Sequence, residues 1–214
     1  AADMLALLDA LGIPKVGIVS HDVGAYVAQV LARKAPERLA GLHFFDCPNP
    51  GIGRRWAAPG HIREIWYQTF NQQPWAAELV GSSRANVALY IGNMLRHWSH
   101  RKDAFDEDFD TWIDNYAWPG NLQGGFDWYG SVAEARLATI EERAPHPGVI
   151  DVPTRVFWGR HDPVLKSEWT DRLGEYFRDV RVGIVEDAGH FPHMEAPERA
   201  AEDIRGFFEE ILRR

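Results

Sequence analysis

The feature that most constrains this chain is the alternation of short apolar runs with helix-length amphipathic segments near both ends. The runs are too short for helices and read as strands, whereas the longer segments between and after them have helical periodicity. Strands joined by helical crossovers form a parallel sheet covered by helices. The predicted strands lie at 16–19, 39–45, 154–158 and 180–185, and the predicted helices lie at 4–11, 25–34, 166–177 and 197–214. The sequence therefore predicts an α/β fold, and the continuous apolar run at 16–19 predicts a strand buried on both faces.

The middle of the chain has a different composition and hydrophobic pattern. From 48 to 150 no buried-strand run occurs, and the periodicity is helical with many tryptophans. The sequence therefore predicts an α/β core built from 1–47 and 151–214, with a helical domain inserted over 48–150.

One strand-to-helix turn has the form small-x-acid-x-small. Ser20 and Gly24 are small where the turn must be sharp, and this geometry would expose the side chain of Asp22 above the sheet. The N–H of Val23 would then lie at a helix N-terminus, where it can stabilise negative charge. Taken alone, the motif is equally typical of a polar turn with Asp22 as a helix N-cap.

Two further polar residues follow predicted strands. Asp162 comes after the strand at 154–158, and His190 comes after the strand at 180–185. Each is weak evidence alone, and we interpret His21, His161 and His193 as structural. Together, a nucleophile, an acid and a histidine occur in the chain order of α/β-hydrolases, each just past a strand.

Three stretches, VGIVSHDVGAYVAQ, VFWGRHDPVL and EDAGHFPHMEAPE, resemble the α/β-hydrolase superfamily, in the branch of epoxide hydrolases and haloalkane or haloacetate dehalogenases. The resemblance covers essentially the whole chain. It implies the C-terminal part of the α/β-hydrolase fold, with 48–150 as its cap domain. It also implies a catalytic triad of Asp22, Asp162 and His190, an oxyanion-binding N–H at Val23, and no metal or organic cofactor.

An aspartate nucleophile restricts the chemistry. The carboxylate is ionised at neutral pH, since its free pKa is ~3.9. It suits attack on a saturated carbon that bears a strained or good leaving group, giving an alkyl ester of Asp22. Water activated by His190, which Asp162 holds, would hydrolyse this ester. The substrate is therefore expected to be a small apolar epoxide or halogenated compound.

The cap favours the epoxide. Epoxide hydrolases of this branch use two cap tyrosines, one in a Tyr-Gln segment and one in a Trp-Tyr pair, and Tyr67 and Tyr129 match them. Trp66, Trp128 and Phe191 are expected to line the substrate pocket. Many haloalkane dehalogenases carry Trp where this chain has Val23. Two alternatives stay open, a dehalogenase with the same triad and an inactive fragment that acts only as a binding or partner module.

The family pattern places further strands, with a His-Gly-x-Pro loop, before the first helix of this chain. We therefore expect the apolar strand at 16–19 to have an unpaired edge. We also expect the isolated chain to be poorly stable or inactive unless an N-terminal segment complements it.

Charge and composition restrict partners and location. The net charge of -8 argues against a nucleic-acid partner. No stretch approaches the ~18 apolar residues that a membrane helix needs. The single cysteine, Cys47, excludes an internal disulfide and favours a reducing compartment, so a cytoplasmic location is expected, although an absent N-terminus would carry any signal sequence.

Overall fold

A parallel sheet forms the centre of the α/β unit. The structure, a computed structural model, describes residues 1–213. Ala1–Ile52 and the residues from His146 onward make one compact unit. In this described part of the chain the strands have the order β1-β2-β3-β4, and each neighbouring pair is parallel. The strands are β1 (Val16–His21), β2 (Leu39–Phe45), β3 (Thr154–Gly159) and β4 (Val180–Val185). The predicted α/β fold is confirmed.

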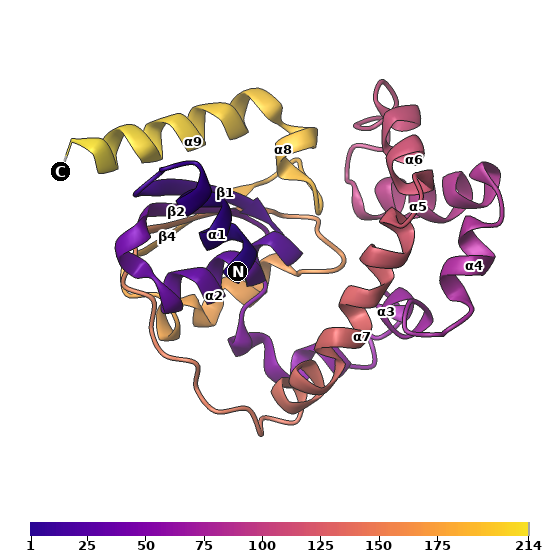
Figure 1. Cartoon of the computed structure of the whole chain (residues 1–214), viewed down its shortest axis with the longest axis horizontal. Coiled ribbons are helices and arrows are strands. Elements are labelled where there is room, and N and C mark those ends of the chain that lie inside the picture. Colours follow the sequence, from indigo (N-terminus) through magenta and orange to yellow (C-terminus); the bar gives the residue numbers. More distant parts are fainter. Residues whose placement is uncertain (214) are drawn as a thin grey trace. The chain divides into compact units, whose positions relative to one another are not determined.

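Helices accompany these strands (Figure 1). They are α1 (Ala2–Ala10), α2 (Val23–Lys34), α8 (Pro192–Glu195) and α9 (Pro197–Leu212), with the 3-10 turns η1 (Pro36–Arg38) and η2 (Pro50–Ala57). Helices α1, α2 and α9 correspond to predicted helices, whereas α8 was not predicted. The helix expected at 166–177 is instead a 3-10 segment, η3 (Ser167–Glu175). Gly174 and the β-branched Thr170 are poor α-helix formers, and 3-10 geometry is common in connectors.

Burial is greatest in the two central strands. Leu42, Phe44 and Val156 are fully buried, as expected for a parallel sheet between helices. The prediction that 16–19 is buried on both faces is wrong, because β1 is an edge strand and Val19 is 45% exposed. The expected unpaired edge is therefore present at β1 among residues 1–213.

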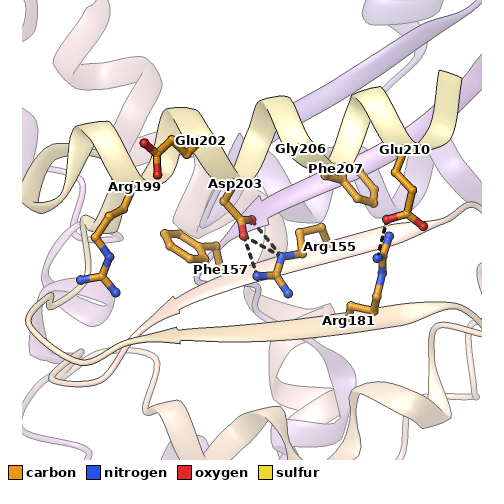
Figure 2. A pocket seen from close by; sticks show the side chains of 9 residues that line it. All are labelled: Arg155, Phe157, Arg181, Arg199, Glu202, Asp203, Gly206, Phe207 and Glu210. Atoms are coloured by element: carbon orange, nitrogen blue, oxygen red, sulfur yellow. Dashed lines mark hydrogen bonds and ion pairs between the residues drawn. The ribbon is translucent and has the colours of Figure 1, made fainter. Parts of the chain in front are cut away.

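Helix α9 lies close against the sheet. A Cβ added at Gly17 would come 2.3 Å from the ring of Phe208, so this strand position must stay small. Arg155 on β3 donates to both carboxylate oxygens of Asp203 on α9, at 2.6 to 3.1 Å (Figure 2). The buried His43 on β2 also contacts Asp203, at 2.9 Å. These contacts hold α9 over β2 and β3.

A groove beside α9 carries three arginines, Arg155, Arg181 and Arg199 (Figure 2). Each of them already pairs with an acid: Asp203, Glu210 and Asp187, respectively. The groove therefore offers little uncompensated charge to a ligand.

The second compact unit is Gly53–Pro145, within the segment whose sequence predicts a helical insertion. Its helices are α3 (Trp66–Phe70), α4 (Ala76–Gly81), α5 (Arg84–Trp98), α6 (Phe109–Ala117) and α7 (Asn121–Ile140). Phe70, Tyr90 and Phe126 pack together with ring centroids 5.4 to 6.4 Å apart. Across residues 1–213, no helix combines the length and the apolar character that crossing a membrane requires.

Candidate active site

The nucleophile candidate occupies a strained turn between β1 and α2. Asp22 has φ 43° and ψ -109°, a conformation that non-glycine residues rarely adopt. A Cβ at Gly24 would come 3.2 Å from the Cβ of Ser20, so the small residues of the motif are needed where the turn closes. The side chain of Asp22 makes no capping hydrogen bond to α2. This observation removes the N-cap explanation, and the strain is of the kind found at functional sites.

Val23 begins α2 directly after this turn. Its N–H belongs to the first helical turn, whose N–H groups have no carbonyl partner within the helix and which carries partial positive charge. The N–H is thus suited to an oxyanion beside Asp22, and that role stays a prediction.

The acid and the histidine are in direct contact. The Nδ1–H of His190 donates to Asp162 Oδ2 at 2.7 Å, and the two side chains are almost fully buried. Asp162 Oδ1 accepts the N–H groups of Val164 and Leu165, at 2.7 and 2.8 Å. A carboxylate with three N–H donors is well stabilised as an anion and fixes the orientation of the imidazole.

The charges around His190 favour its protonation. Burial lowers the pKa of His190, but the charge and hydrogen bond of Asp162, with the charges of Asp22 and Glu195, outweigh burial. The pKa of His190 is consequently raised above 6.5. An imidazole with this environment accepts a proton readily at neutral pH, as a general base requires.

The loops that carry Asp162 and His190 touch through two glycines. A Cβ at Gly159 would come 1.8 Å from the carbonyl oxygen of Gly189, so no side chain fits there. Glu195 Oε1 accepts the N–H groups of Gly189 and Phe191, at 2.9 and 3.2 Å. Both loops follow strands of one parallel sheet, whose carboxyl ends share an edge.

Sequence reasoning missed two residues of this site, Asp46 and Glu195. Asp46 follows β2 directly, so the rule that found Asp162 and His190 could also have found it. It is fully buried, and ligand-type atoms of His21, Asp46 and His190 lie within 4.8 Å of one another.

His21, interpreted from sequence as structural, touches His190. Its Nε2–H donates to the carbonyl oxygen of His190 at 2.7 Å. Its ring centroid lies 4.6 Å from that of His190, 4.9 Å from that of His193 and 5.5 Å from that of Phe191. His21 therefore anchors the loop of the candidate base.

The two predicted cap tyrosines meet within the helical unit. Tyr67 on α3 and Tyr129 on α7 have ring centroids 5.7 Å apart at 87°. Tyr67 is 3% exposed, and its hydroxyl accepts the side-chain N–H of Gln68 at 3.1 Å. Trp66 is 47% exposed and packs edge-on against Tyr90, and Trp128 on α7 is half-buried. The pocket roles of Trp66, Trp128 and Phe191 stay predictions.

Residues 1–197 match the family model described as alpha/beta hydrolase fold. The chain belongs to the α/β-hydrolase family. Similar proteins include epoxide hydrolase 1 of Caenorhabditis elegans, 24% identical over 96% of this chain and 50% of that protein. They also include human epoxide hydrolase 4, 23% identical over 99% of this chain and 58% of that protein. This α/β-hydrolase chain thus spans between half and three fifths of the length of these two relatives.

A solved structure of the epoxide hydrolase CorEH has the same fold. It is 24% identical and superposes with a TM-score of 0.80, over 98% of this chain and 73% of that one. At this identity the likeness shows the α/β-hydrolase fold, and the substrate has to be argued from the site.

Proposed function

We propose that the protein hydrolyses epoxides to vicinal diols through an alkyl ester on Asp22. The observation that carries the proposal is the carboxylate at the strained turn, where a hydroxyl or thiol would favour acyl transfer. The names of the relatives support it further, since both are epoxide hydrolases.

In the first step, a carboxylate oxygen of Asp22 attacks an epoxide carbon and the C–O bond of the ring breaks. The hydroxyls of Tyr67 and Tyr129 donate to the departing oxygen and supply its proton. The T-shaped contact of the two rings keeps the two side chains together, which is what the proposal needs if both hydroxyls are to bind one oxygen. The proposal requires the cap to bring them over Asp22.

In the second step, His190 removes a proton from water, and the hydroxide attacks the ester carbonyl carbon. Asp162 stabilises the imidazolium, and the N–H of Val23 stabilises the oxyanion. The carbonyl C–O bond then breaks, the proton of the new carboxyl group passes to the leaving alkoxide, the diol departs and the Asp22 carboxylate is restored. The imidazolium of His190 loses its proton to solvent, and the tyrosinate left by the first step takes one up from solvent. The support for this step is the 2.7 Å contact between His190 and Asp162.

Trapping tests the sequence of steps. Asp22→Asn should abolish diol formation from styrene oxide, and His190→Gln should accumulate protein heavier by one substrate molecule. Turnover that survives Asp22→Asn, without reversion to Asp, would contradict the nucleophile.

Substitution of both tyrosines tests the cap assignment. The Tyr67→Phe, Tyr129→Phe double variant should lower epoxide turnover by at least about 100-fold, the range of general acid catalysis. Tyr90→Phe is the matched control, because Tyr90 lies in the same aromatic unit and donates to Asn71 instead. An equal, small effect of both changes would remove the tyrosine role.

A dehalogenase is the second candidate, because the same three residues could displace a halide. The half-buried indole of Trp128 is a group that could bind the leaving halide. Halide release from haloalkanes or haloacetate, without diol formation, would establish it. Binding of apolar molecules without either product would favour the binding module.

A further inference from the structure

Asp46 is a buried carboxyl group that the proposed mechanism does not use. It follows β2 with φ 44°, and its backbone N–H donates to the carbonyl of Phe157 at 3.3 Å. Its Oδ1 accepts the N–H of Gly159 at 2.9 Å. Its Oδ2 is buried and has no hydrogen-bond partner among residues 1–213. A buried anionic oxygen without a donor is costly, so this geometry favours a proton on Oδ2.

Asp46 lies among other acidic side chains and two histidines. Asp162 after β3, Asp22 before α2 and Glu195 on α8 all act on it electrostatically. His21 and His190 have nitrogen atoms within 4.8 Å of its carboxyl group. Burial and these negative charges raise the pKa of Asp46 well above 3.8.

Asp46 and Asp162 compete for one negative charge, because two neighbouring buried carboxyls rarely ionise together. Asp162 accepts three N–H groups, whereas Asp46 accepts one. By this count of donors, the site stabilises a carboxylate better at Asp162 than at Asp46.

We propose that Asp46 is a positioning residue for His190: a protonated carboxyl beside the Asp162–His190 pair that takes over the negative charge whenever Asp162 is neutral. In that state Asp46 Oδ2 releases its proton to solvent, and the carboxylate supports the imidazolium. The proposal rests on the proposed function, because it assigns Asp46 a part in the hydrolytic step.

Carbon-13 NMR of the protein labelled at aspartate carboxyl carbons tests the ionisation directly and needs no turnover. We expect the Asp46 signal, assigned by its loss in Asp46→Asn, to be that of a protonated carboxyl at pH 7. In Asp162→Asn at the same pH, it should be that of a carboxylate. An ionised Asp46 in the unsubstituted protein, or a protonated one in Asp162→Asn, overturns the proposal. Because this readout is independent of catalysis, it separates failure of the proposal from failure of the proposed function.

Decay of the alkyl-enzyme tests the link to His190. Asp46→Asn should slow decay by a factor at least about ten times larger in the Asp162→Asn background than in the presence of Asp162. Asp203→Asn is the control, since it removes a partly buried carboxylate from α9 and should act equally in both backgrounds. Equal factors for Asp46→Asn in the two backgrounds overturn the proposal.

Discussion

The Nε2–H of His21 donates a hydrogen bond to the backbone carbonyl oxygen of His190, at 2.7 Å, and this bond holds the loop that carries His190. His21 immediately precedes Asp22, so one residue pair links the candidate nucleophile to the candidate base. The pKa of His21 lies well below 6.5, because burial and the neighbouring His190 and His193 oppose its protonation. His21 is thus neutral, with one N–H for this contact.

His21→Phe should weaken the site more than the fold. It keeps an aromatic ring but leaves a buried carbonyl without its donor, which costs ~1–3 kcal/mol of unfolding free energy. Urea unfolding should show this loss, and decay of the alkyl-enzyme should slow because His190 loses its anchor. If the variant is destabilised but its alkyl-enzyme decays as fast as that of the unsubstituted protein, the contact serves stability alone.

Stability should fall as the pH falls below 6.5. Burial and then the charge of His190 lower the pKa of His193 to about 4. Between 6.5 and about 4 the unfolded chain takes up a proton at this position and the folded chain does not, so acid favours unfolding. His193→Gln should reduce the difference in unfolding free energy between pH 7 and pH 5, as measured by urea titration. His190 has a raised pKa and therefore opposes this trend. If the difference stays the same in His193→Gln, the lowered pKa of His193 is not the cause of the acid sensitivity.

The strands and the order of the triad were predictable because both depend on local pattern. Apolar runs predicted β2 and β3 closely. The loops that follow β3 and β4 carry Asp162 and His190, which meet at 2.7 Å. The apolar run at 16–19 wrongly suggested burial on both faces, and only the family pattern indicated that this strand has an unpaired edge. The position of Asp46 directly after β2 was readable from the sequence, but its burial without a full set of hydrogen bonds was not. The significance of a buried carboxyl depends on its three-dimensional neighbours, and several of them here, such as Gly159, come from positions more than a hundred residues away.

Gly159→Ala should disrupt the site through packing alone. The added Cβ would overlap the carbonyl oxygen of Gly189, 1.8 Å away, and push apart the loops of Asp162 and His190. We expect a loss of more than about 3 kcal/mol in unfolding free energy, or failure to fold. Gly174→Ala is the matched control, because nothing lies within 4 Å of a Cβ there. Similar melting temperatures for the two variants would show that the loops of Asp162 and His190 can move apart without loss of stability.

Asp203→Asn should destabilise the protein at neutral pH but leave the chemistry of the site unchanged. Burial raises the pKa of Asp203, but hydrogen bonds from His43 and Arg155 outweigh it and lower the pKa to about 2. A carboxyl with a lowered pKa contributes stability above pH 3.8, and this contribution disappears as the pH falls through about 2. Urea unfolding at pH 7 should therefore show a loss on the order of 2 kcal/mol, since the buried His43 and the guanidinium of Arg155 lose their anionic partner. Near pH 2 the variant and the parent should converge, and a gap that persists there would place the effect in packing of α9 and not in charge.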